Sequence, residues 1–162
     1  MFSIKQCLNN QRPAAYAEMA GAPSHPEIRG RVEFYPAGNG VLVMAEICGL
    51  PENDGACPSG VFGFHIHEGA ACTGNAEDPF SNTGPHFNPG NCAHPAHAGD
   101  LPPLFGNDGY AFMTVFTRRF HVCDIIDRTV IIHAKPDDFT TQPSGNSGQK
   151  IACGQIKGVC GS

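Results

Sequence analysis

Residues 28–47 have the sequence IRGRVEFYPAGNGVLVMAEI, and their pattern is typical of two paired strands. From Ile28 to Phe34 apolar and polar side chains alternate, which is the period of a strand with one buried face. The Ala-Gly-Asn-Gly segment at 37–40 predicts a turn, because Asn-Gly between two apolar runs is a strong hairpin signal. We therefore expect Val41 to Ile47 to pair with the first run as an antiparallel hairpin.

The rest of the chain repeats this pattern of short apolar runs and turns. It has 20 Gly and 14 Pro in 162 residues, a content that favours many short strands over helices. Further strands are expected at 15–19, 61–67, 110–120, 128–133 and 151–156. Two stretches, residues 69–106 and 134–149, are too long for hairpin loops, and long loops in a compact domain are commonly functional. We expect an all-β sandwich or flattened barrel.

Length and charge limit the classes of protein. A chain of 162 residues predicts one domain, here residues 15–162, preceded by an N-terminal arm at 1–14. The net charge of −5 argues against a nucleic-acid partner, and no apolar run approaches the roughly 20 residues that span a membrane. The first ten residues lack the apolar segment of a signal peptide, so we expect a cytoplasmic location, with export as the alternative if a leader has been removed from the chain. We interpret the pair Arg118-Arg119 as a solvated strand end without a functional role.

Histidines are concentrated in one part of the chain, with seven of the eight between residues 65 and 133. His65 and His67 share one face of a predicted strand, and Phe64 and Ile66 share the other. The apolar face can be buried while the histidine face binds a metal. Taken alone, the His-x-His pair is weak evidence for a metal site, and it fits two exposed strand histidines better.

A second group has the composition of a zinc site. His86, His94, His97 and Asp100 lie within fifteen residues, and imidazole and carboxylate both bind zinc well. The alternative is a polar loop with incidental histidines. His133 follows an apolar strand and enters the second long stretch, and the combination with the other groups favours a metal site.

The eight cysteines do not identify a compartment or a disulfide pattern. None forms a Cys-x-x-Cys pair, which argues against a zinc ribbon or a thioredoxin-like site. Spacing alone leaves the pairing of the cysteines open.

With these residues assembled, the chain resembles the copper/zinc superoxide dismutase family over residues 15–157. The resemblance rests on four ordered motifs: Gly63-Phe64-His65-Ile66-His67-Glu68, Gly84-Pro85-His86-Phe87-Asn88-Pro89, His97-Ala98-Gly99-Asp100-Leu101, and Ile132-His133 with Asp137-Asp138, closing on Ala152-Cys153-Gly154. It implies an immunoglobulin-like Greek-key barrel or sandwich of eight antiparallel strands, with copper and zinc beneath two long functional loops.

The resemblance also implies a role for each site residue. The implied copper ligands are His65, His67, His86 and His133, and the implied zinc ligands are His86, His94, His97 and Asp100. Asp137 is expected to link His65 to His94, and His86 is expected to bridge the metals as an imidazolate. The family's internal disulfide corresponds to Cys72 and Cys153. Six cysteines have no place in the family pattern: Cys7, Cys48, Cys57, Cys92, Cys123 and Cys160.

The implied activity is the antioxidant conversion of two superoxide anions and two protons to dioxygen and hydrogen peroxide. His86 is expected to supply a proton. Lys150 stands where the family usually has an arginine that docks the anion, and it keeps the charge without the planar guanidinium fork. We therefore predict activity that is retained but reduced. The resemblance allows a homodimer, although family members dimerise through different faces or remain monomeric.

Two other functions compete with the enzyme. A non-catalytic metal-binding member of the fold would bind copper or zinc without turnover, because fold alone does not prove activity. A copper-delivery protein would carry a Cys-x-Cys or Met-x-Cys-x-x-Cys motif, and neither occurs. The presence of all six implied histidine ligands and Asp100 favours the enzyme.

Overall fold

The computed structural model describes residues 11–52 and 60–159, which form eight strands and two short helical segments. The elements are β1 (Ala15–Gly21), β2 (Arg29–Ala37), β3 (Gly40–Cys48), β4 (Gly60–His67), η1 (Ser81–Thr83), β5 (Asp100–Gly106), β6 (Tyr110–Thr117), α2 (Val122–Ile125), β7 (Thr129–His133) and β8 (Lys150–Gly158). Cys7, Cys57 and Cys160 lie outside the described residues. No helix in the described ranges is long and apolar enough to cross a membrane.

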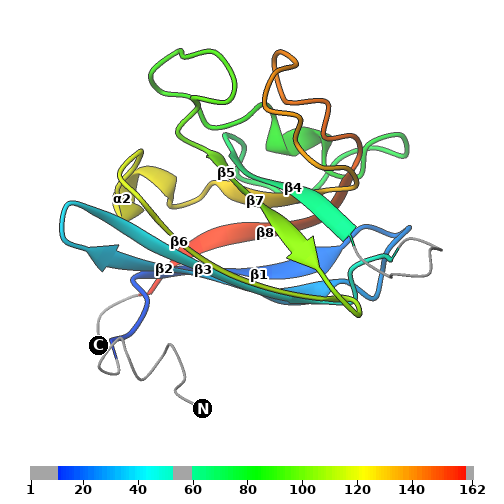
Figure 1. Ribbon diagram of the computed structural model, residues 1–162, viewed down its shortest axis with the longest axis horizontal. Helices are drawn as coiled ribbons and strands as arrows, with labels where there is room; N and C mark the ends of the chain where they lie inside the picture. Colours follow the sequence, from blue (N-terminus) through cyan, green and yellow to red (C-terminus); the bar gives the residue numbers. More distant parts are fainter. Residues whose placement is uncertain (1–10, 53–59, 160–162) are drawn as a thin grey trace.

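The strands form one antiparallel sheet in the order β5-β4-β7-β8-β1-β2-β3-β6. The sheet curves until its edge strands β5 and β6 come into contact, so the barrel is nearly closed. The connections from β3 to β4 and from β6 to β7 cross between distant positions in the sheet, as in a Greek key. The expected all-β barrel is confirmed. Both long loops lie over the β4, β5 and β7 side of the barrel, at the top of Figure 1.

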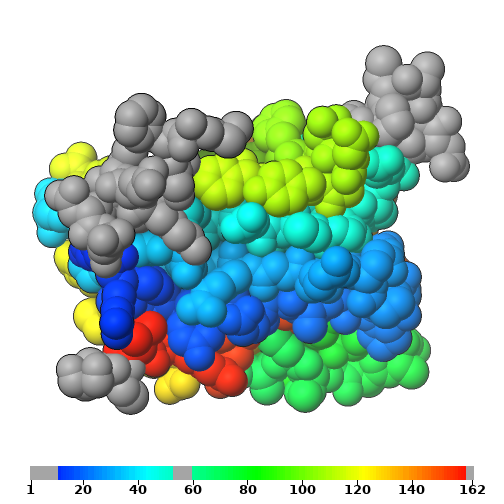
Figure 2. Space-filling model, turned by 90° about the horizontal axis from the view of Figure 1, so that it is seen from below, coloured from blue at the N-terminus to red at the C-terminus, as the bar shows by residue number. Residues whose placement is uncertain are grey.

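The predicted hairpin is confirmed as β2 and β3. Their register runs from Arg29 opposite Cys48 to Ala37 opposite Gly40, which leaves Gly38 and Asn39 as the two turn residues. Gly38 has a φ of 55°, a conformation that glycine adopts at little cost. The outer face of this hairpin and of β1 is seen in shades of blue in Figure 2.

Two strand predictions were wrong. Residues 100–106 were expected to lie in the first long loop but form β5, which pairs with β4 and buries Leu101 and Leu104. Pro102 and Pro103 argue against a strand at this point of the sequence, because proline cannot donate a ladder hydrogen bond. Both are accommodated because β5 is an edge strand whose register with β4 shifts between Phe62 and Phe64. The strand expected at 110–120 ends at Thr117.

The core fills the inside of the barrel with apolar side chains from every strand. Strand β4 contributes Phe62, Phe64 and Ile66, which are buried against the inner faces of the other strands. The predicted alternation is confirmed, because His65 and His67 point away from this core and are buried beneath the long loops instead. Both faces of β4 are therefore covered.

Substitution of Phe64 tests the predicted face of β4. Phe64 has no exposed surface, so Phe64→Ala is expected to lower the free energy of unfolding by about 3–5 kcal/mol, through lost burial and a new cavity. Phe105→Ala is the matched control, because Phe105 is 72% exposed on the neighbouring strand, and it is expected to cost at most about 0.5 kcal/mol. Urea unfolding measures both. Equal effects for the two variants would contradict the assignment of the core face.

Candidate metal centre

Two groups of buried side chains meet above β4 and share one residue. The first group contains His65, His67, His86 and His133, and the second contains His86, His94, His97 and Asp100. Within each group, one nitrogen or oxygen atom per residue lies within 4.8 Å of those of the other members. The structure thus brings all seven predicted ligand residues together in two groups that are both able to hold a metal ion.

Backbone pairing brings the loop ligands to the strand ligands. His65 and His67 belong to β4, and His133 ends the neighbouring strand β7. The backbone of His86 pairs with that of His67 as an isolated antiparallel β-bridge. The Phe87 N–H donates to the Ile66 carbonyl at 2.8 Å. The first long loop is therefore attached along β4, which fixes His86 beside the strand histidines.

Hydrogen bonds outside the first group set which nitrogen of each ring is free. His67 Nδ1 donates to the Gly84 carbonyl at 2.7 Å, and His133 Nδ1 donates to the Gly148 carbonyl at 3.2 Å. The Nε2 atoms of these two rings face each other at 3.3 Å. With Nδ1 protonated on both rings, the facing lone pairs are suited to a shared metal ion.

Asp137 links the two groups. His65 Nε2 donates to one of its carboxylate oxygens and His94 Nε2 to the other, each at 2.9 Å, and the Phe139 N–H adds a bond of 2.7 Å. Burial raises the pKa of Asp137, but these bonds outweigh it and hold that pKa well below its usual range. The carboxylate therefore stays ionised and directs Nδ1 of both rings toward the metal groups.

The second group is centred on Asp100. One of its oxygens lies 2.8 Å from His86 Nδ1, and the other lies 3.1 Å from His94 Nδ1 and 3.3 Å from His97 Nδ1. Two buried ring nitrogens of the described groups, His65 Nδ1 and His86 Nε2, have no hydrogen-bond partner, and His94 Nδ1 faces Asp100 without forming a hydrogen bond. Unpartnered buried nitrogens of this kind fit metal ligands, because a buried polar atom without any partner is costly.

Burial keeps the strand histidines neutral. Burial and, to a smaller extent, the neighbouring imidazoles lower the pKa of His67 well below its usual value and that of His133 to about 3. Burial is also the main cause of the lowered pKa of His65. Neutral imidazoles have the free lone pair that metal binding requires.

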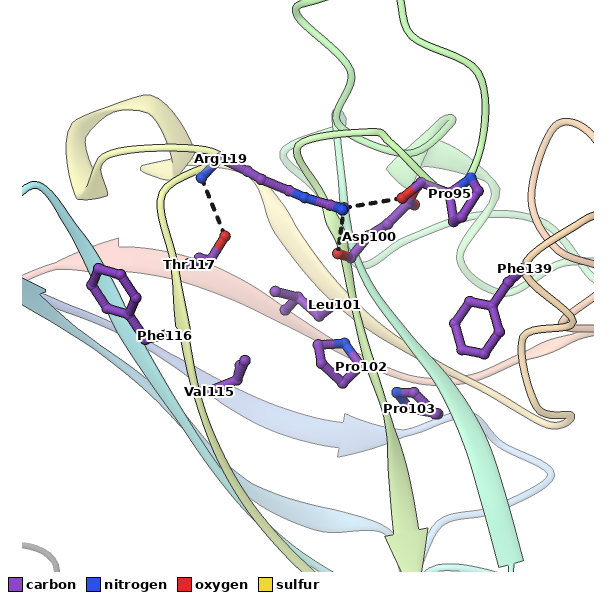
Figure 3. A pocket seen from close by; sticks show the side chains of 10 residues that line it. All are labelled: Pro95, Asp100, Leu101, Pro102, Pro103, Val115, Phe116, Thr117, Arg119 and Phe139. Carbon is purple, nitrogen blue, oxygen red and sulfur yellow. Dashed lines mark hydrogen bonds between the residues drawn. The ribbon is translucent and has the colours of Figure 1, made fainter.

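Two residues without a predicted role hold the second group in place. The Gln142 side chain accepts from the His94 N–H at 3.0 Å and donates to the His94 carbonyl at 2.6 Å. Arg119 Nη1 donates to the carbonyls of Pro95, His97 and Asp100 at 3.0–3.2 Å, as Figure 3 shows in part. Arg119 is exposed, as expected for a solvated strand end, and its guanidinium reaches from the end of β6 to the loop. Neither residue belongs to a sequence motif that could have identified it.

A cavity of about 440 Å³ opens onto the metal groups. His67, His86, His97 and His133 line it together with Lys150, the first residue of β8. Lys150 therefore lies at the wall of the cavity that opens onto the metal groups.

A disulfide joins the first long loop to β8. Cys72 and Cys153, which are 81 positions apart in the sequence, form this disulfide, and Phe80 packs beside it. Cys48, Cys92 and Cys123 are free thiols. The disulfide implied by the family resemblance is thus present, close in sequence to Lys150.

Comparison with known proteins agrees with this geometry. The family model described as "Copper/zinc superoxide dismutase (SODC)" matches residues 28–156. The chain belongs to the copper/zinc superoxide dismutase family. It is thereby an oxidoreductase, with copper and zinc as its cofactors.

Curated relatives in this family come from several bacteria. A protein named "Superoxide dismutase [Cu-Zn]" from Deinococcus radiodurans is 30% identical over 97% of this chain and 91% of its own length. A protein of the same name from Legionella pneumophila is 35% identical over 82% of this chain and 80% of its own length. The chain therefore spans most of the length of both superoxide dismutases.

Gly145 is expected to be required for the Asp137 link in this superoxide dismutase fold. Its φ is 68°, and a Cβ atom there would overlap an Asp137 carboxylate oxygen and lie 2.7 Å from His94 Nε2. We expect Gly145→Ala to weaken zinc binding by roughly 10- to 100-fold, the usual effect of losing such a supporting contact.

The control for this variant is Gly38→Ala. Gly38 also has a positive φ, but no atom lies within 4 Å of a Cβ placed there. The substitution is expected to cost about 1 kcal/mol of stability and to leave zinc affinity unchanged. Competition with a chromogenic chelator measures the affinities. Equal zinc affinity in the two variants would contradict the role of Gly145.

The lowered pKa of His133 predicts how stability depends on pH in the metal-free protein. Between pH of about 6.5, the usual histidine pKa, and about 3, the unfolded chain binds a proton that folded His133 does not. Stability is therefore expected to fall as the pH falls through this window. Urea unfolding between pH 7 and 4 measures it, and His133→Leu is expected to have a flatter profile. Stability that rises toward pH 4 would contradict the assignment.

Proposed function

We propose that the chain is an active superoxide dismutase with copper held by His65, His67, His86 and His133 and zinc held by His86, His94, His97 and Asp100. The observation that carries this proposal is that His86 belongs to both buried groups, with Nδ1 facing Asp100 and Nε2 unpartnered. An imidazole with both nitrogens available in this way is able to bridge two metals as imidazolate.

The substrate is superoxide, and the overall reaction converts two superoxide anions and two protons into dioxygen and hydrogen peroxide. Copper, when bound, supplies the one-electron redox change, whereas zinc has no accessible redox step. When Nε2 of His86 is not a copper ligand, it would take up a proton from water and pass it to the superoxide that is being reduced. Asp137 keeps the rings of His65 and His94 in orientation, because it accepts from the outer nitrogen of each.

Lys150 is proposed to dock the anion at the cavity. Its ammonium is held at the wall of the space that His86 and His133 also line. Because an ammonium lacks the planar fork of a guanidinium, it holds a small anion with less defined geometry. This supports the expectation of activity that is retained but reduced.

The alternative of a non-catalytic metal-binding protein is less well supported. Such a protein needs neither a solvent-accessible metal nor a cation beside it. Here the cavity reaches His67, His86 and His133, and Lys150 lines the same space. An accessible site with an adjacent positive charge favours turnover of a small anion.

We also propose a cytoplasmic location. Cys92 and Cys123 are exposed free thiols, which fit a reducing compartment. In the disulfide, Cys153 is buried and Cys72 is half-buried. Cell fractionation distinguishes this location from an exported one.

Stopped-flow measurement of superoxide decay tests the activity. The protein is loaded with one copper and one zinc, free copper is chelated, and metal content is verified. His133→Ala is expected to lower the rate roughly 100-fold or more, because it removes a copper ligand and opens the group. His25→Ala is the control, since His25 lies outside both groups, and it is expected to keep the parent rate. A metal-loaded parent that is no faster than His133→Ala would favour the non-catalytic alternative.

A further inference from the structure

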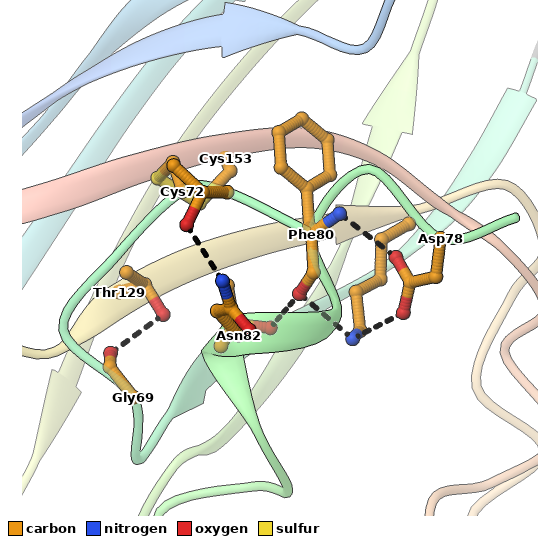
Figure 4. The surroundings of a disulfide bond; sticks show 10 residues. Gly69, Cys72, Asp78, Phe80, Asn82, Thr129 and Cys153 are labelled. Carbon is orange, nitrogen blue, oxygen red and sulfur yellow. Dashed lines mark hydrogen bonds and ion pairs between the residues drawn. A yellow bond between two sulfur atoms is a disulfide. The ribbon is translucent and has the colours of Figure 1, made fainter. Parts of the chain in front are cut away.

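Lys150 is not a free cation in the structure. Its Nζ donates to Asp78 Oδ2 at 2.8 Å and to the Phe80 carbonyl at 3.1 Å. Figure 4 labels these two acceptor residues in the surroundings of the disulfide. The Lys150 side chain is 15% exposed, whereas that of Asp78 is 40% exposed. The ammonium thus uses two of its three donors on the first long loop and has one left for another acceptor.

The Asp78 carboxylate is itself fixed by the loop. The Phe80 N–H donates to Asp78 Oδ1 at 2.9 Å, so the two carboxylate oxygens have different partners. The Asn75 side chain accepts from the Glu77 and Asp78 N–H groups, each at 2.9 Å, and closes the turn before the carboxylate. A carboxylate held in this way stays in place without Lys150, and so it positions the lysine.

The pair matters because of what else lines the cavity. Among the described residues that line it, Lys150 is the one lysine or arginine, and Glu68 adds a negative charge. Burial raises the pKa of Asp78, but hydrogen bonds from Lys150 and Phe80 outweigh it and keep the carboxyl ionised. The permanent positive charge at this cavity therefore has a negative partner in direct contact.

We propose that Asp78 positions the Lys150 ammonium at the wall of the metal cavity and cancels part of its charge, so that small anions are drawn to the cavity less strongly than by an unpaired lysine. Asp78 is a positioning residue in this account, because it acts on the anion through Lys150. The inference rests on the proposed function only in taking superoxide to be that anion.

Azide binding to the copper- and zinc-loaded protein tests this inference without measuring turnover. The charge-transfer absorbance of copper(II) is titrated with azide at low ionic strength. Asp78→Asn keeps an oxygen that can accept from Lys150 but removes the charge, and it is expected to lower the azide Kd on the order of three- to tenfold. Glu77→Gln is the matched control, because it removes the same charge one residue away, and a change of less than about twofold is expected.

Lys150→Gln completes a double-mutant cycle. This substitution is expected to raise the azide Kd and to abolish the effect of Asp78→Asn in the double variant. An unchanged Kd in Asp78→Asn, an equal effect of Glu77→Gln, or an Asp78→Asn effect that persists without Lys150 would each overturn the inference. If the parent protein showed no superoxide turnover while the azide shifts occurred as expected, the proposed function would fail and the role of Asp78 would stand.

Discussion

The burial of both faces of strand β4 is the constraint on which the rest of the structure depends. One face presents Phe62, Phe64 and Ile66 to the barrel core, and the other presents His65 and His67. Burial of the apolar side chains lowers the free energy of the folded state. Burial of the two imidazoles raises it unless each ring nitrogen has a partner. The long loops meet this requirement by bringing carbonyl groups, a carboxylate and further metal ligands over the histidine face.

The loops are organised from the outside of the metal groups inward. Asp137 joins the two groups by accepting from both His65 and His94, while Gln142 and Arg119 hold the loop backbone around the second group. Because Nε2 of His65 and of His94 donates to Asp137, the inward-pointing Nδ1 atoms of these two rings carry free lone pairs. Such supporting contacts set ligand orientation before a metal arrives, which is a general property of preorganised metal sites.

The charge at the cavity is set by contacts across the fold rather than by net charge. The protein carries a net charge of −5, and its substrate as proposed is an anion. Lys150, at the start of β8, supplies the local positive charge, and Asp78 in the first long loop forms an ion pair with it. Attraction of the anion is therefore short-ranged, and it depends on the geometry of one ion pair.

The sequence by itself determined the parts of this protein that depend on local pattern. Alternation and the Asn-Gly signal predicted the β2–β3 hairpin, and the ordered histidine motifs predicted the seven residues that meet in two groups. Strand β5 was missed because Pro102 and Pro103 are tolerated only through its position at the sheet edge. The tertiary structure alone decided the contacts of Asp78 with Lys150 and of Arg119 and Gln142 with the loop around His94. The partners in these contacts are as many as 72 residues apart, and no local pattern encodes an interaction that exists only once the barrel has brought its loops together.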